Sequence, residues 1–191
     1  MMSFYDELKR KAIHLSALAI PLGVWMVPRR MALVVLGVLA GACLIADFLR
    51  MAHPSLRRLY FTLFGRIIRD HERKEKLTGA TYVLLSGVLC VWLFQKDVAI
   101  VALTYMLIGD TTAALVGRRW GRRRIRQGKT VEGTVACLGI CCLIGVALPL
   151  VPWWKALAGA VIATVVEFLP SGVDDNLGIP LVSGGIMQLL L

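Results

Sequence analysis

Six carboxylates lie inside or at the ends of apolar stretches of this sequence, where an ionisable side chain is costly to place. They are Asp47, Asp110, Glu132, Glu167, Asp174 and Asp175. Acidic groups in such surroundings usually face a polar cavity, a metal ion or a charged partner. Asp110 in "LIGDTTAALVG" is the clearest case, because hydroxyl side chains and small residues flank it. We predict that Asp110 binds a divalent metal ion; the alternative is a structural carboxylate that caps a helix or pairs with an arginine.

The stretch that follows Asp110 is rich in glycine and arginine and suits a phosphate group. "GRRRIRQGKT" (residues 121–130) resembles a nucleotide-binding P-loop, but six residues separate its two glycines where that motif has four. Its glycines permit tight turns, and its arginines and Lys129 can neutralise phosphate oxygens. The next helix, beginning at Thr130 or Glu132, exposes backbone amides that can also hold a phosphate. With a carboxylate on either side, the loop is predicted to bind a triphosphate with Mg²⁺.

Composition indicates which elements position these residues. Of the 191 residues, 58% are hydrophobic, well above the roughly 45–50% typical of soluble domains. They are grouped into blocks close to the length of a membrane-spanning helix, which is about 20 residues. We therefore predict an all-α, polytopic membrane helix bundle that forms a single domain over residues 1–191. The seven blocks lie at 12–28, 31–49, 78–95, 97–117, 134–152, 154–170 and 177–191.

Two blocks have further features. The last block is short and contains Gly178, Pro180 and two more glycines, so a re-entrant or broken helix inside the protein is an alternative there. The second block contains Gly37 and Gly41 in a GxxxG arrangement. Such small residues permit close helix contact, within the chain or in a homo-oligomer.

Positive charge is divided unevenly between the two ends of the predicted helices. With the amino terminus inside, 18 of the 22 Lys and Arg residues fall in cytoplasmic segments, and the opposite side holds only Arg29, Arg30, Lys96 and Lys155. This asymmetry orients membrane proteins. We expect the amino terminus and the carboxylate-rich site on the cytoplasmic side of a prokaryotic cell membrane. The net charge of +10 is then mostly topological, and nucleic-acid binding is not expected.

The basic segment between the second and third blocks has a helical pattern of its own. Apolar residues recur at helical spacing with arginines between them, at Leu56, Leu59, Tyr60, Leu63, Phe64, Ile67 and Ile68. The pattern predicts a cytoplasmic helix that lies in the membrane interface against anionic headgroups. A positively charged connector without this role is the alternative.

Several segments together resemble one known family. "GDTTAALVGRRWG" followed by "GKTVEGT" is similar to the signature of membrane-bound lipid kinases that use CTP, namely dolichol kinase, phytol kinase and yeast-type diacylglycerol kinase. These kinases are distantly similar to phosphatidate cytidylyltransferases. Further segments resemble the family in the same order along the chain, and they are "ELKRKAIH" (7–14), "EKLTGATY" (75–82) and "VEFLPSGVDDNLGIPL" (166–181).

The resemblance implies a reaction and a set of site residues. CTP would be the phosphoryl donor, Mg²⁺ the cofactor, and the hydroxyl of a polyprenol, dolichol, phytol, geranylgeraniol or diacylglycerol the acceptor. Asp110 and Lys129 would be catalytic. The implied nucleotide-binding residues are Gly117, Arg118, Gly121, Lys129, Thr130, Gly133 and Asn176. The implied metal ligands are Asp110, Glu132 and Asp175, and residues near the lipid or closing the pocket are Arg10, Lys11, His14, Asp47, Thr78 and Glu167.

Two other classes of protein share parts of this pattern. A cytidylyltransferase would use the same CTP and Mg²⁺ but would act on an acidic lipid and release pyrophosphate. A transporter would also have broken helices and buried carboxylates, but its polar groups gather near the membrane midplane. Here the carboxylates lie at one end of their helices, which favours the kinase.

Overall fold

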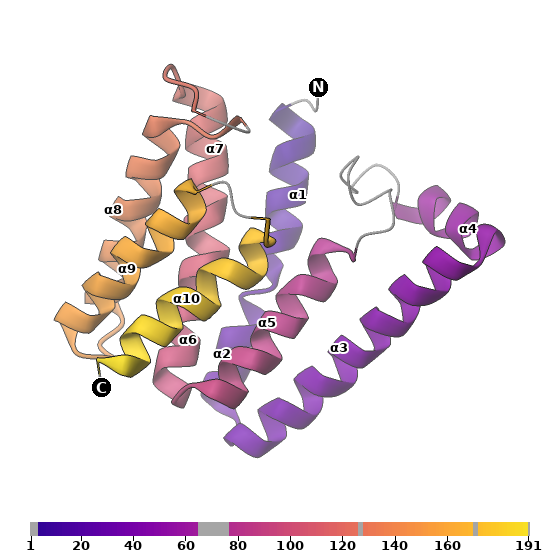
Figure 1. The fold of residues 1–191 in the computed structure, drawn as a ribbon, viewed down its shortest axis with the longest axis horizontal. Helices are drawn as coiled ribbons and strands as arrows, with labels where there is room; N and C mark the ends of the chain where they lie inside the picture. Colours follow the sequence, from indigo (N-terminus) through magenta and orange to yellow (C-terminus); the bar gives the residue numbers. More distant parts are fainter. Residues whose placement is uncertain (1–3, 65–76, 126–127, 170–171, 191) are drawn as a thin grey trace.

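The computed structural model describes residues 4–64, 77–125, 128–169 and 172–190, which form a helical bundle (Figure 1). Its elements are α1 (Phe4–Ser16), α2 (Ala19–Met26), α3 (Arg29–Ala52), α4 (Pro54–Phe64), α5 (Gly79–Leu93), α6 (Lys96–Thr104), a π-helical turn (Tyr105–Gly109), α7 (Asp110–Trp120), α8 (Val131–Ala147), α9 (Trp153–Phe168) and α10 (Asp175–Leu189). In these ranges the only β contact is an isolated bridge between Arg124 and Thr130. The predicted all-α fold class is therefore confirmed.

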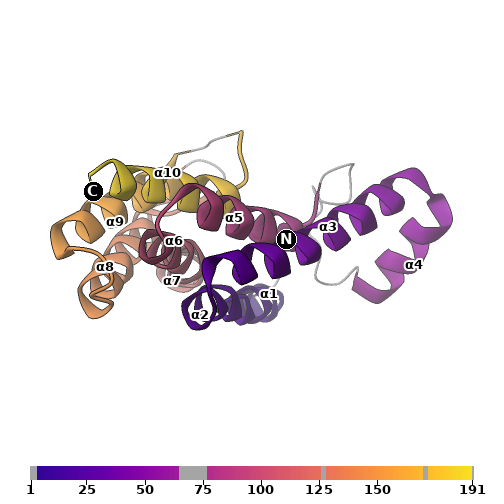
Figure 2. The same ribbon diagram turned by 90° about the horizontal axis from the view of Figure 1, so that it is seen from below.

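The core of the bundle is a continuous helical rod formed by α6, the π-helical turn and α7. Every residue from Val98 to Leu103 is buried, because this helix is apolar all round and neighbouring helices cover it. Helices α8, α9 and α10 pack one against the next, α10 and α2 pack against α6, and α3 packs mainly against α5. Figure 2 shows α3 and α4 extending away from the rest of the bundle.

The seven apolar blocks all form helices, but their lengths differ from the expectation. Within the described ranges, two helices are long and apolar enough to cross a membrane, Arg29–Ala52 and Lys96–Trp120. The other blocks form shorter helices, so the seven-span topology stays a prediction. α10 is a single continuous helix that includes Pro180, so residues 175–189 do not form the broken helix considered for the last block.

The first block does not form one helix as expected. α1 ends at Ser16 and α2 begins at Ala19, with a turn between them. The reason is Pro21, which has no N–H to donate and whose ring clashes with the carbonyl four residues earlier in a continuous helix. Proline is tolerated within the first turn of a new helix, and α2 starts two residues before it. The break leaves α1 as a separate element, which the charged residues described below anchor to α7.

The end of the bundle with few basic residues has two features of a membrane boundary. Arg29 Nε donates to the carbonyl oxygen of Val91 at 2.8 Å, and Lys96 Nζ donates to that of Val27 at 3.0 Å. These cations thus satisfy carbonyls at helix carboxyl ends that have no partner within their own helix. Four tryptophans near the same helix ends are largely exposed: Trp25, Trp92, Trp153 and Trp154. Tryptophan is enriched at membrane interfaces, which agrees with the proposed membrane location.

The predicted interfacial segment is described only in part. α4 is a helix, and Leu56, Arg57 and Arg58 in its first half are exposed. Four of the apolar residues that carry the amphipathic pattern, Leu59, Tyr60, Leu63 and Phe64, belong to α4, and Ile67 and Ile68 lie outside the described residues. The helical prediction is therefore confirmed for Pro54–Phe64, and the interfacial role stays a prediction.

The GxxxG pair of α3 is not used for packing within the described bundle. A Cβ atom added at Gly37 or at Gly41 would have no heavy atom within 4 Å. The pair is thus open on the surface of α3, and contact with a second copy of the chain stays a prediction.

Candidate functional site

Asp110 lies where the central rod changes from the π-helical turn to α7. Such turns are rare and occur often at functional sites. The residue before it, Gly109, is in close contact with α8, because a Cβ there would lie 2.8 Å from the sulfur of Cys141. The turn therefore fixes the position of Asp110 relative to the packed helices. Sequence reasoning singled out Asp110 but missed the π-helical turn.

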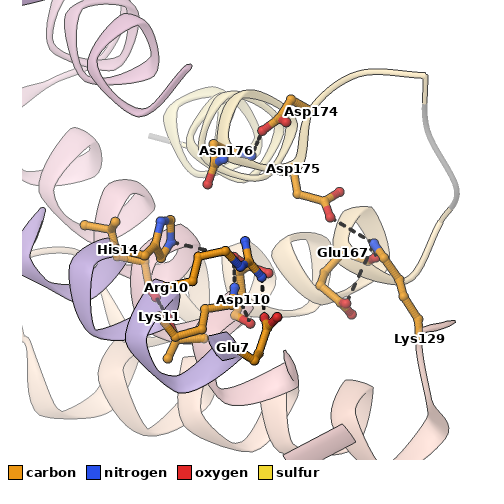
Figure 3. Close-up of polar contacts among 12 residues, drawn as sticks. Glu7, Arg10, Lys11, His14, Asp110, Lys129, Glu167, Asp174, Asp175 and Asn176 are labelled. Carbon is orange, nitrogen blue, oxygen red and sulfur yellow. Dashed lines mark hydrogen bonds and ion pairs between the residues drawn. The ribbon is translucent and has the colours of Figure 1, made fainter. Parts of the chain in front are cut away.

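Two titratable side chains of α1, those of Lys11 and His14, meet the Asp110 carboxylate (Figure 3). Lys11 Nζ lies 2.5 Å from Asp110 Oδ2 and 3.3 Å from the Asp110 carbonyl oxygen, and the Lys11 side chain is 1% exposed. His14 Nε2 lies 3.6 Å from the same Oδ2 atom. Helical spacing places Lys11 and His14 on one face of α1. The structure thus brings together three residues that the sequence analysis assigned to two different roles.

Glu7 forms a second contact between α1 and α7. One carboxylate oxygen pairs with Arg10 Nη2, and the other lies 3.0 Å from Arg118 Nη2. The Glu7 side chain is 3% exposed, and that of Arg118 is 38% exposed. Arg10 and Arg118 were expected in the site, whereas Glu7 was part of the resembling segment but was assigned no role.

Lys129 connects the loop after α7 to the last two helices. Its Nζ donates to the carbonyl oxygen of Glu167 and lies 3.1 Å from Asp175 Oδ2 and 3.7 Å from Glu167 Oε1. The Thr134 hydroxyl lies 3.5 Å from the other oxygen of the Glu167 carboxylate. Lys129 therefore joins α9 and α10 at the point where the chain passes from one to the other.

The two clusters belong to one site. The charges of Asp110 and Asp175 both act electrostatically on the carboxylate of Glu167, and the charge of Asp110 acts on Asp175 as well. Figure 3 shows the α1 residues on one side and Lys129 on the other, with the start of α10 between them. Four helices (α1, α7, α9 and α10) and the loop before α8 thus contribute charged groups to the same end of the bundle.

The two described parts of the loop, residues 121–125 and 128–130, lie side by side. Ile125 N donates to the Lys129 carbonyl at 2.8 Å, and Val131 N donates to the Arg123 carbonyl at 3.1 Å. Gly128 has a φ of +81°, a conformation that favours glycine. Gly128 provides this backbone conformation, and Lys129 after it reaches α9 and α10. The described part of the loop is not a strand-to-helix P-loop, as the spacing of its glycines indicated.

Glu132 and Thr130 lie at the beginning of α8. The Thr130 hydroxyl accepts a hydrogen bond from the amide of Gly133 at 3.1 Å and so caps the helix. Glu132 Oε1 accepts from the Arg123 amide at 3.3 Å. Hydrogen bonds from its own amide and from those of Arg122 and Arg123 hold the pKa of the exposed Glu132 carboxyl below its usual range. Glu132 therefore stays ionised at neutral pH.

The glycines expected to bind the nucleotide have a packing role. A Cβ on Gly117 would lie 2.7 Å from Thr130 Oγ1, and one on Gly133 would lie 2.6 Å from the Ala113 carbonyl oxygen. A Cβ on Gly121 would lie 2.5 Å from the methyl group of Thr130. These contacts explain the glycines without a ligand, because they allow α7 and α8 to approach closely. Their contact with a nucleotide stays a prediction.

Replacing Gly133 by alanine is therefore expected to destabilise the protein. Overpacking costs about 1–3 kcal/mol, and the Ala113 carbonyl is backbone and has little freedom to move. Gly139 on the same helix is the matched control, because a Cβ there has no neighbour within 4 Å. Thermal unfolding in detergent should show a lower Tm for Gly133→Ala and an equal or higher Tm for Gly139→Ala. Equal midpoints for both variants would contradict the packing role.

Asn176 lies in the first turn of α10 and carries an unused acceptor. Its Oδ1 is buried and has no hydrogen-bond partner among the described residues. The Asn176 amide donates to Asp174 Oδ1 at 2.9 Å, so Asp174 caps the helix. A buried acceptor without a partner costs free energy, which is consistent with a ligand contact at this position.

The predicted metal ligands do not form a preassembled cage. No group of three or more His, Cys, Asp or Glu side chains suited to a metal is found in the described ranges. Asp110 and Asp175 each face a lysine, and Glu132, in the first turn of α8, accepts from a backbone amide of the loop. Mg²⁺ is usually held by one or two carboxylates together with substrate phosphates. The carboxylates of Asp110 and Asp175 fit that mode, with Mg²⁺ arriving with the nucleotide.

Asp47 and Thr78 form a separate buried cluster between α3 and α5. Asp47 Oδ2 accepts from the Thr78 amide at 2.8 Å and from the Thr81 hydroxyl at 2.7 Å, and Asp47 Oδ1 lies 3.0 Å from Arg50 Nη2. Asp47 is 2% exposed. The carboxylate thus caps the amino terminus of α5 from a neighbouring helix, and this geometry favours a structural role over the predicted contact with the lipid.

Replacing Asp47 by alanine should destabilise the fold. The change leaves Arg50 buried without its carboxylate and removes the cap of α5, and breaking a buried pair in this way costs roughly 3–5 kcal/mol. The expected result is a strongly lowered Tm in detergent. Asp97→Ala, an exposed carboxylate at the opposite end of the bundle, is the control. A normal Tm combined with an altered KM for lipid would restore the substrate role.

Comparison with known proteins identifies relatives over most of the chain. An uncharacterized protein of Rickettsia prowazekii is 30% identical over 187 residues, covering 93% of this chain and 91% of the relative. The CTP-dependent diacylglycerol kinase 1 of Schizosaccharomyces pombe is 27% identical, covering 76% of this chain and 74% of that protein. A probable chloroplastic phytol kinase of Glycine max is 31% identical; 72% of this chain matches it, and the match spans about half, 53%, of its length.

No protein-family model matches the sequence, and no solved structure matches it significantly. The relatives nevertheless include proteins named as a diacylglycerol kinase and as a phytol kinase. The match to the Rickettsia protein extends over nearly the whole of both chains. The chain belongs to the protein family that includes the CTP-dependent diacylglycerol kinases and the phytol kinases.

Proposed function

We propose that the protein is a lipid kinase that transfers the terminal phosphoryl group of CTP to the hydroxyl of a membrane lipid. Two lysine–carboxylate contacts support this most, Lys11 with Asp110 and Lys129 with Asp175. Both lie at one end of the bundle, close enough for the charge of Asp110 to act on Asp175. Cations and carboxylates in this combination can hold a polyphosphate and its metal. The names of the relatives support both the donor and the class of acceptor.

The residues of the site have distinct tasks in this proposal. Phosphoryl transfer depends mostly on positioning and on neutralising charge. Lys11, Arg10 and Arg118 would neutralise phosphate oxygens from the α1 and α7 side, and Lys129 would do so from the α8 side. The carboxylates of Asp110 and Asp175 would hold Mg²⁺ bound with the nucleotide, and the ion would supply further neutralisation of phosphate charge. The acceptor hydroxyl would approach Asp110, whose carboxylate can orient it or accept its proton, with His14 close enough to share that proton.

The membrane location is part of the proposal. The site lies at the end of the bundle that carries most of the basic residues, where the carboxyl end of α7 meets the amino ends of α8 and α10. Under the positive-inside rule this end faces the cytoplasm, where CTP is available. The opposite end carries the four exposed tryptophans. The lipid hydroxyl would then reach the site from the cytoplasmic leaflet.

Product analysis tests the proposal. The purified protein in detergent is given Mg²⁺ with CTP or ATP and one of four alcohols: phytol, geranylgeraniol, a polyprenol or diacylglycerol. The proposal expects CDP and one phosphorylated lipid. Pyrophosphate released with an acidic lipid would instead identify a cytidylyltransferase. If no nucleotide is consumed with any lipid, the kinase proposal is wrong.

A further inference from the structure

Glu7 is a buried carboxylate with two arginine partners on different helices. We propose that Glu7 is a positioning residue that holds Arg10 and Arg118 at the spacing needed to bind the phosphates of the nucleotide. The inference rests on the proposed function, and it adds to the site a residue that is not expected to touch the substrate.

The geometry of Glu7 is that of a bridge. Its two carboxylate oxygens are used separately, one for Arg10 on the next turn of α1 and one for Arg118 near the end of α7. The side chain is 3% exposed, so water competes little for these contacts. An anchored guanidinium loses less conformational freedom when it binds an anion. Glu7 thus prepares both arginines before the nucleotide arrives.

Arg10 keeps a donor for a ligand, and Arg118 is partly exposed. The Arg10 Nε–H is buried and has no hydrogen-bond partner among the described residues. Arg118 is bound to Glu7 through Nη2, and its side chain is 38% exposed. A guanidinium has five N–H donors, so the contact of Arg10 Nη2 with Glu7 leaves its Nε–H for a phosphate oxygen. Figure 3 shows Arg10 and Glu7 close to Asp110.

Electrostatics explains why a carboxylate is needed between them. Two guanidinium groups that approach the same anion repel each other when the site is empty. The negative charge of Glu7 offsets that repulsion and reduces the net charge of the three groups to +1. Without it, we expect the arginines to move apart, or to compete with Lys11 for Asp110.

A purely structural role would produce different kinetics. If Glu7 only fastens α1 to α7, its loss lowers Tm and the fraction of active protein, and the KM for nucleotide stays constant. If Glu7 positions the arginines, its loss raises the KM for nucleotide and leaves the KM for lipid unchanged.

The test compares Glu7→Gln, Glu7→Asp and the control Asp97→Asn, an exposed carboxylate at the far end of the bundle. For each variant the Tm, the Kd for CTP with Mg²⁺ in the absence of lipid, and the steady-state KM values and kcat are measured. We expect Glu7→Gln to raise the Kd and KM for CTP about tenfold, the equivalent of one lost contact of about 1.4 kcal/mol. Glu7→Asp keeps the charge and should recover part of the loss.

A double-variant cycle adds a second criterion. Because Glu7 acts partly through Arg118, Glu7→Gln combined with Arg118→Gln should weaken CTP binding by less than the sum of the two single losses. Additive losses, or an unchanged Kd in Glu7→Gln, would overturn the inference. Failure of the proposed function is recognised separately, because the unmodified protein would then phosphorylate none of the lipids, whereas the binding titration does not require turnover.

Discussion

Asp110→Asn is expected to lower kcat/KM for lipid phosphorylation by about 10²–10³-fold, the loss typical of removing one preorganised electrostatic group. Asparagine keeps the shape of the side chain but not the charge that Lys11 and His14 face. It is also a poor metal ligand and cannot accept the proton of the hydroxyl. Phosphorylated lipid formed from CTP is the measurement, and Asp97→Asn is the control for loss of a carboxylate elsewhere.

The same substitution has a structural effect that must be separated from the chemical one. Lys11 is fully buried against Asp110, and removing one partner of a buried pair is strongly destabilising. The variant Asp110→Asn with Lys11→Met removes both charges, so it should regain much of the lost Tm. It should remain inactive. A double variant with normal activity would show that Asp110 is a structural carboxylate, the alternative left open by the sequence.

Much of the helical arrangement could be predicted from the sequence, because apolar blocks and charge asymmetry are local properties. The blocks correspond to α2, α3, α5, α6 with α7, α8, α9 and α10. Consecutive helices run in opposite directions, so the basic segments, which follow every second apolar block, come together at one end of the bundle. Asp110 was recognisable for the same reason, since a carboxylate in an apolar block is conspicuous by itself.

Other features depend on contacts between distant parts of the chain. The pairing of Glu7 with Arg118 joins residues more than a hundred positions apart, and no spacing rule indicates it. The packing of Gly117 and Gly133 is visible only when α7 and α8 are placed together. Glycine in a basic loop fits both phosphate binding and close helix contact, so the residue type alone could not separate the two.

The surroundings of Asp47 could not be predicted for a related reason, and its contact with the lipid stays a prediction. Sequence reasoning treats any carboxylate in an apolar block as a candidate for chemistry, as it did for Asp110. The two differ in their partners: Asp47 accepts hydrogen bonds from the amino terminus of α5 and from Arg50, whereas Asp110 faces a lysine and a histidine. The donors around a carboxylate, which come from other helices, decide whether it is structural or available for a substrate.

Lys129→Met is expected to lower kcat/KM for CTP by about 100-fold, in the range found when a single electrostatic contact to the transition state is removed. Lys129 is the cation that the loop delivers to α9 and α10, and its side chain is 19% exposed. Methionine preserves most of the length and volume and removes only the charge. The variant removes the cation that faces Glu167, whose side chain is 6% exposed, so Tm is measured as well, and a loss of kcat/KM in protein that is folded at the assay temperature is chemical.

Two further variants, Lys129→Arg and Arg122→Gln, test whether Lys129 acts individually or only through the total charge of the loop. The ammonium group of Lys129 contacts the Glu167 carbonyl oxygen and the Asp175 carboxylate together, and the larger, planar guanidinium does not reproduce that geometry. Arginine should therefore restore little activity. Arg122 is an exposed cation on the same loop, and its loss should leave kcat/KM nearly unchanged. If Lys129→Met and Arg122→Gln lowered kcat/KM equally, the loop would act through its total charge, and Lys129 would have no individual role.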